Sequence, residues 1–171
     1  MVSTFKSLIR SLRPVQWLKN GFVLAPIIFS GRIDDPEAWV RGLMAVVSFC
    51  AASSATYLVN DILDREADRA HPEKCKRPIA AGEVSVGLAM AAAVVLLAFS
   101  LAIAFAIGGW FPAIVVAYVV LVVLYSLALK RLVFLDVLVV AAGFVLRVLG
   151  GVVAIEVPLS RWILLVAYLL A

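Results

Sequence analysis

The chain has 171 residues, of which 65% are hydrophobic and 15% are charged, and its formal net charge is +4. Its mean hydropathy is +1.11, whereas soluble domains are only about 45–50% apolar. This composition excludes an ordinary soluble domain and predicts an integral membrane protein. Because the net charge is small, we expect membrane lipids and no nucleic acid as partners.

The N-terminal residues 1–13 predict a short basic amphipathic segment that approaches the membrane. Pro14 then opens a first expected span over residues 15–30, which contains Lys19 and Asn20. Polar residues inside a membrane generally face the bundle interior or a cavity, so both are candidates for substrate binding. The alternative, which stays equally open, is that Lys19 extends its amine to the lipid headgroups.

Further spans are expected over residues 38–60, 84–107, 110–129 and 136–155. No charge occurs in the 46 residues from 84 to 129, which suffices for two spans of about 20 residues each. The segment 162–171 begins a sixth span but holds only ten residues. We therefore expect residues 1–171 to form one all-α transmembrane domain, a polytopic helical bundle that is incomplete at its C-terminus.

The distribution of lysine and arginine predicts the orientation of the bundle. With the N-terminus inside, eleven of these residues fall on the cytoplasmic side and three on the outer side, with Arg147 counted as intramembrane. An excess of positive charge marks cytoplasmic loops. The sequence thus places the protein in the cell membrane with its N-terminus in the cytoplasm.

A polar island at residues 60–82 interrupts the apolar sequence and holds five of the eleven acidic residues. It opens with the pattern N-D-x-x-D-x-x-x-D, formed by Asn60, Asp61, Asp64 and Asp68. On one helix these side chains would share a face. Clustered carboxylates are unfavourable without a cation, and oxygen ligands favour a hard ion. The pattern therefore predicts a face that binds Mg²⁺ or Mn²⁺, at the cytoplasmic end of a span.

Basic residues follow the acids, on a segment bounded by Pro72 and Pro78. Proline ends helical continuation, so we expect this loop to fold back over the acidic face. Its Lys74, Lys76 and Arg77 have the chemistry that binds phosphate oxygens. Acids for a metal beside cations for phosphate predict a pyrophosphate site, and a merely solvated charged loop is the alternative.

The span expected over residues 136–155 carries Asp136, Gly143, Arg147 and Gly150 on one helical stripe, which should face the interior. Asp136 lies about 16 Å from Arg147 along a helix, too far to pair with it. Arg147 therefore needs another anion, either an acid elsewhere in the bundle or a lipid-linked phosphate. The small residues at 51–56 predict close helix packing.

The acid pattern, together with RPIAAG at residues 77–82, resembles the UbiA-type superfamily of intramembrane prenyltransferases. Tyr125 with Lys130 and Arg131 is similar to the second polar loop of that superfamily. The motifs RPxQWxKN from Arg13 and DRAHP from Asp68 resemble the branch that transfers 5-phosphoribosyl from phosphoribosyl diphosphate to decaprenyl phosphate. That reaction supplies a precursor of cell-wall arabinan.

The resemblance implies a ring of nine transmembrane helices around a cavity open to the cytoplasm. It also implies a Mg²⁺ cofactor held by Asn60, Asp61, Asp64 and Asp68, the three aspartates being catalytic. The partners would be a phosphorylated sugar donor and a lipid-linked phosphate acceptor. The candidate substrate-binding residues are Lys19, Asn20, Lys74, Lys76, Arg77, Tyr125, Lys130, Arg131 and Arg147.

Two other functions remain open from the sequence. The first is prenyl transfer from a polyprenyl diphosphate to an aromatic acceptor, in which the same acids would hold the diphosphate. The second is a cation transporter or channel with an acidic ring. A ring of that kind requires acids near the bilayer centre, whereas Asp61 to Asp68 are expected at a cytoplasmic end, so this reading is the weakest. The sequence leaves a homo-oligomer open.

Overall fold

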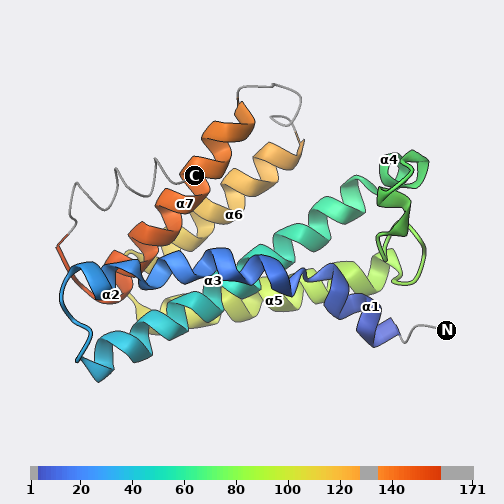
Figure 1. Ribbon diagram of the computed structural model, residues 1–171. Coiled ribbons are helices and arrows are strands. Elements are labelled where there is room, and N and C mark those ends of the chain that lie inside the picture. The colour runs from blue at the N-terminus through green and yellow to red at the C-terminus, as the bar shows by residue number, and fades with distance from the viewer. Residues whose placement is uncertain (1–3, 128–134, 159–171) are drawn as a thin grey trace.

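The computed structural model describes residues 4–127 and 135–158, and these ranges are helices joined by turns, with no strand among them (Figure 1). The all-α fold class is confirmed. In chain order the helices are α1 (Thr4–Ser11), η1 (Pro14–Leu24), α2 (Ala25–Phe29), α3 (Pro36–Leu63), α4 (Arg65–Ala70), η2 (Lys74–Lys76), α5 (Val86–Ile107), α6 (Phe111–Leu127) and α7 (Leu135–Ala154).

Three of these helices are long and apolar enough to cross a membrane: α3, α5 and the Val137–Ala154 part of α7. The apolar helix α6 is shorter. These four helices run alternately in opposite directions, so the C-terminal ends of α3 and α6 lie at the same end of the bundle (Figure 1). The protein is therefore a multi-pass membrane protein. The segment expected to begin a sixth span lies outside the described residues.

The first expected span, residues 15–30, is not one α-helix. Its first part is the 3-10 helix η1, and the short α2 follows it. Pro26 stands in the first turn of α2, where it cannot donate a backbone hydrogen bond. At the other end Arg13, before η1, has a left-handed backbone with φ of 55°. A 3-10 helix of eleven residues is uncommon, and such stretches often mark a hinge or strain.

The long helix α3 begins where Asp35 and Pro36 predict a helix start. The Asp35 carboxylate accepts hydrogen bonds from the backbone N–H groups of Glu37 and Ala38, at 2.9 and 3.3 Å. Proline fits the first helical position because its missing N–H would have no partner there. The N–H of Ala38 and the Arg32 guanidinium lower the pKa of Asp35. This cap fixes the end of α3 that lies opposite the acid motif.

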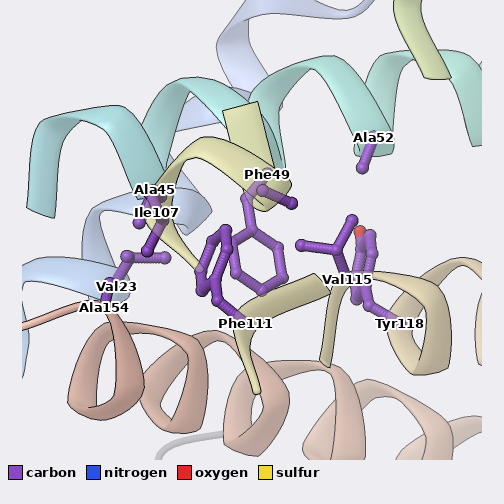
Figure 2. Close-up of a cluster of buried hydrophobic side chains, with 10 residues drawn as sticks. Val23, Ala45, Phe49, Ala52, Ile107, Phe111, Val115, Tyr118 and Ala154 are labelled. Atoms are coloured by element: carbon purple, nitrogen blue, oxygen red, sulfur yellow. The ribbon is translucent and has the colours of Figure 1, made fainter. Parts of the chain in front are cut away.

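Aromatic rings from α3 and α6 fill the centre of the bundle (Figure 2). Phe49 meets Phe111 and Tyr118 edge to face, with ring centroids 5.9 and 5.4 Å apart. Edge-to-face contact is a favoured geometry for aromatic pairs. Residues 51–56 of α3 are all buried, which confirms that these small residues serve packing.

Two buried serines join α3 to α5 by reciprocal hydrogen bonds. Ser48 Oγ donates to the Ser100 carbonyl at 3.0 Å, and Ser100 Oγ donates to the Ser48 carbonyl at 2.8 Å. In a membrane, small hydroxyl residues let helix backbones approach and also bond across the interface. The acid motif therefore stands at the end of a helix that is held firmly against its neighbour.

The polar and glycine stripe on α7 faces the interior, as expected for Gly143, Arg147 and Gly150, which are all buried. The side chain of Asp136 lies outside the described part. The adjacent Gly151 marks the closest approach of two elements, because a Cβ placed there would lie 2.0 Å from the backbone oxygen of Val23 in η1. Only glycine fits this crossing.

We predict that Gly151→Ala lowers the stability of the protein by about 1–3 kcal/mol, because the added methyl must push η1 away from α7. The measurement is the thermal unfolding midpoint in detergent. Gly87→Ala is the matched control, since a Cβ at Gly87 in α5 has no neighbour within 4 Å. Equal midpoints for the two variants would contradict this account of the crossing.

Candidate active site

The acid motif spans two helices rather than the single helix that the pattern suggested. Helix α3 ends at Leu63 and α4 begins at Arg65, with Asp64 between them. The chain stays close to helical, because the Asp64 N–H bonds to the Asn60 carbonyl at 2.9 Å and the Asp68 N–H to the Asp64 carbonyl at 2.8 Å. Asp61 and Asp68 consequently remain on one side of the chain.

The side chains of Asp61 and Asp68 are buried, with only 2% and 3% of their surfaces exposed. The Arg77 guanidinium joins them, as its Nη1 lies 3.2 Å from Asp61 Oδ1 and 2.8 Å from Asp68 Oδ2. A second guanidinium, that of Arg13, donates to the same Asp61 oxygen at 2.5 Å. Buried carboxylates are costly unless they are paired and hydrogen-bonded. Two arginines from distant segments provide the pairing here.

The basic loop folds back over the acids, as the two prolines predicted. Helix α4 ends at Ala70, and after η2 the chain is extended at Arg77, which aims its side chain at the acids. Arg69 Nε also donates to the Ala80 carbonyl at 3.1 Å and so connects α4 to the part of the loop that runs back toward it. The fold of residues 64–82 therefore brings acids and cations together.

The donor atoms at this position fit a hard divalent ion. The described ranges contain no group of three His, Cys, Asp or Glu side chains that could hold a metal, so any ion would have two carboxylate ligands at most in this arrangement. The carboxylates of Asp61 and Asp68 do converge on one cationic nitrogen of Arg77. Mg²⁺ commonly takes one or two carboxylates and completes its shell with water and substrate phosphates. Two converging carboxylates are compatible with such an ion.

A hollow of about 250 Å³ opens beside the acids. Its lining residues come from α1, α3 and the basic loop: Arg10, Ser11, Arg13, Asp61, Glu73, Lys76, Arg77 and Pro78. Lys76 is exposed and forms no ion pair with any carboxylate in the described part of the chain. Four cations and two acids line the hollow, which favours a ligand that carries phosphate.

Helix α1 closes one side of this hollow through contacts with Glu83. Ser7 Oγ donates to Glu83 Oε2 at 2.7 Å, and Arg10 Nη2 donates to the same oxygen at 2.9 Å. The Ser7 hydroxyl, and next the Arg10 guanidinium, lower the pKa of Glu83 against the opposing effect of desolvation. The basic N-terminal segment is thereby fastened to the loop that carries Lys76 and Arg77.

Arg147 and Asn20 meet in the middle of the bundle. Arg147 donates from Nε to Asn20 Oδ1 at 2.8 Å, from Nη1 to the Gly143 carbonyl at 2.9 Å, and from Nη2 to the Tyr118 hydroxyl at 2.9 Å. The side chain is 6% exposed. Among the described residues its partners are neutral dipoles, whereas the sequence predicts an anion. The Tyr118 ring, 4.8 Å from the guanidinium carbon, adds a cation–π contact.

The other predicted substrate-binding residues take different places. Lys19 is exposed on η1, next to the buried Asn20, and Lys74 is exposed on η2. Tyr125 is half-buried in the last turn of α6. Lys130 and Arg131 lie outside the described residues.

Sequence reasoning missed two contacts that shape this region. The sequence marks Arg13 only as part of a motif, and its partner Asp61 is 48 positions away. Tyr118 stands in an apolar run that gives no sign of a buried arginine nearby. The signal for Arg13 was the unusual Arg-Pro pair directly before a predicted membrane helix.

Comparison with known proteins places this arrangement in a family. The model of the UbiA prenyltransferase family matches residues 22–171. This chain belongs to that family.

The chain is similar to the decaprenyl-phosphate phosphoribosyltransferase of Corynebacterium glutamicum, with 42% identity over 94% of this chain and 49% of the relative. It is 40% identical to the protein of that name from Mycolicibacterium smegmatis, over 93% of this chain and 51% of the relative. The chain thus spans about half the length of these relatives. A UbiA homolog from Archaeoglobus fulgidus bound to DMAPP and Mg²⁺ has a TM-score of 0.79 and 26% identity, covering 96% of this chain and 60% of that chain.

We predict that Tyr118→Phe destabilises the bundle by about 1–3 kcal/mol, because it leaves a buried Arg147 N–H without its acceptor. Thermal unfolding in detergent measures the effect. Tyr57→Phe is the matched control, since the Tyr57 hydroxyl makes no hydrogen bond with the described residues. A similar loss of stability in both variants would refute the role given to the Tyr118 hydroxyl.

We further expect the attachment of α1 to depend on pH. Because the pKa of Glu83 is lowered from its ordinary value of 4.5, its contribution is complete above that value and is lost as the pH falls through the lowered pKa. Glu83→Gln should mimic the protonated form and speed amide hydrogen exchange in α1 at neutral pH. Glu73→Gln, on the same loop, should leave that exchange unchanged. Protection of α1 that survives Glu83→Gln would be inconsistent with this anchor.

Proposed function

We propose that the protein is a Mg²⁺-dependent transferase that moves 5-phosphoribosyl from phosphoribosyl diphosphate to a polyprenyl phosphate and releases diphosphate. The observation that carries the proposal is the pair of buried aspartates, Asp61 and Asp68, beside a cation-lined hollow at one end of a membrane bundle. The names of the relatives support the substrates. The positive-inside count supports a hollow that faces the cytoplasm, where a soluble sugar diphosphate is available.

In this proposal the acids of the site bind the metal ion and the cations bind the phosphates of the donor. Asp61, Asp64 and Asp68, assisted by Asn60, would hold Mg²⁺, which would neutralise charge on the diphosphate leaving group. Lys74, Lys76 and Arg77 bind the donor phosphates from the loop side. Lys76 and Arg77 line the hollow together with Arg13, so three cations face a ligand placed there.

The acceptor reaction needs no general base. A phosphate oxygen of the polyprenyl phosphate attacks C1 of the ribose, the C1–O bond to the diphosphate breaks, and its electron pair leaves with the diphosphate. Because the attacking oxygen is already an anion, no proton has to be removed. Lys19, Asn20, Tyr125, Lys130, Arg131 and Arg147 remain candidates for contacts with the acceptor phosphate or the sugar 5-phosphate.

Prenyl transfer from a prenyl diphosphate to an aromatic acceptor is a second candidate. The observation in its favour is the structural likeness to a UbiA homolog bound to the prenyl diphosphate DMAPP and Mg²⁺. Acids that bind a metal ion and its diphosphate could act in phosphoribosyl transfer and in prenyl transfer alike. The higher identity to the phosphoribosyltransferases supports the first candidate.

The two candidates differ in which labelled donor enters the lipid fraction. The protein, expressed in membranes at its full natural length, is supplied with Mg²⁺, labelled phosphoribosyl diphosphate and polyprenyl phosphate. We expect label in extracted lipid, lost on addition of EDTA and reduced at least about 100-fold by Asp61→Asn or Asp64→Asn. Lys6→Gln, which removes an exposed cation of α1 that does not line the hollow, is the control for nonspecific change.

The contrary result is equally specific. Lipid that stays unlabelled, while a prenyl diphosphate is consumed with an aromatic acid as acceptor, would refute phosphoribosyl transfer and favour the second candidate.

A further inference from the structure

We propose that Arg13 is an internal competitor of the metal ion, because its guanidinium holds the Asp61 carboxylate that the metal requires. Arg13 and a divalent cation would then exchange on the same oxygen, and metal loading would be coupled to the junction between α1 and η1. The proposal rests on the metal site of the proposed function, and it adds a built-in control of how tightly that site binds its ion.

The contact geometry supports an exchange at the rim of the hollow. Arg13 Nη2 lies 2.5 Å from Asp61 Oδ1. The Asp61 side chain is almost fully buried, whereas 29% of the Arg13 side chain is exposed. Arg13 also lines the hollow. The carboxylate is therefore fixed, and its cationic partner is the member of the pair that can move into solvent.

Arg13 is better suited to leave than Arg77. Arg77 bridges Asp61 and Asp68, so its departure would break two ion pairs. In the described part of the chain Arg13 pairs with one carboxylate, and its guanidinium also lies over the Tyr57 ring, 4.9 Å from the centroid. Loss of Arg13 from Asp61 leaves that carboxylate still bonded to Arg77 or to an incoming ion.

The backbone at Arg13 links this exchange to the N-terminal segment. Its φ of 55° lies in the left-handed region, which is unfavourable for a residue with a Cβ and persists where surrounding contacts hold it. Arg13 is also the point where α1 stops and η1 starts. The ion pair with Asp61 is one of the contacts that hold this strained junction, so releasing it loosens the junction while the Ser7 and Arg10 contacts with Glu83 still hold α1.

Charge gives the direction of the effect. A guanidinium and a divalent ion on one carboxylate repel each other, so each weakens the binding of the other. With Arg13 in place, metal binds Asp61 only after the guanidinium has been displaced. Removing that guanidinium should therefore tighten metal binding in the absence of any substrate.

The test measures binding of Mn²⁺ alone, by loss of the electron paramagnetic resonance signal of free Mn²⁺, to the protein in nanodiscs. We expect Arg13→Gln to lower the apparent Kd about tenfold, as for loss of a charge-assisted hydrogen bond. Arg10→Gln is the matched control, because Arg10 has the same charge and lines the same hollow but pairs with Glu83. It should change the Kd far less.

A second variant covers the case in which Arg13→Gln does not fold. Tyr57→Leu keeps both charges and removes the ring that holds the guanidinium over Asp61, so it should tighten Mn²⁺ binding by a smaller factor. Equal Kd values in the wild type, Arg13→Gln and Tyr57→Leu would overturn the proposal and leave the proposed function standing. Absence of Mn²⁺ binding to the wild type and to Arg13→Gln would overturn both.

Discussion

The burial of two carboxylates, one in the last turn of the membrane helix α3 and one on the short α4 that follows, is the constraint on which the site depends. Asp61 and Asp68 are almost withdrawn from solvent, and anions in that position require cations nearby. Arg77 meets the need from the loop that folds back after α4, and Arg13 meets it from the N-terminal segment. The contacts of both segments with the end of α3 and with α4 therefore supply the cations that these two carboxylates require.

Arg147 shows the other way in which this fold buries a charge. Its guanidinium is surrounded by an amide oxygen, a backbone carbonyl and a hydroxyl, which are dipoles fixed by η1, α7 and α6. These three partners come from three elements that pack together. The acid site differs because both of its cations come from its rim, where about 28–29% of each side chain is exposed.

The sequence was sufficient for features set by local composition. The uncharged run from 84 to 129 predicted two apolar helices, and the small residues at 51–56 predicted close packing. It was insufficient where distant contacts decide. The break at Asp64 and the 3-10 geometry of η1 depend on packing rather than on propensity, and the pairing of Arg13 with Asp61 joins residues 48 positions apart. The dipoles that surround Arg147 could not be predicted either, because Asn20 and Tyr118 are distant from it in the sequence.

These features suit a ligand that carries both signs of charge. A divalent ion bound to a diphosphate offers positive charge to Asp61 and Asp68 and negative charge to the arginines that now neutralise them. In the proposed function such a ligand would replace the internal ion pairs without leaving a buried charge unpaired.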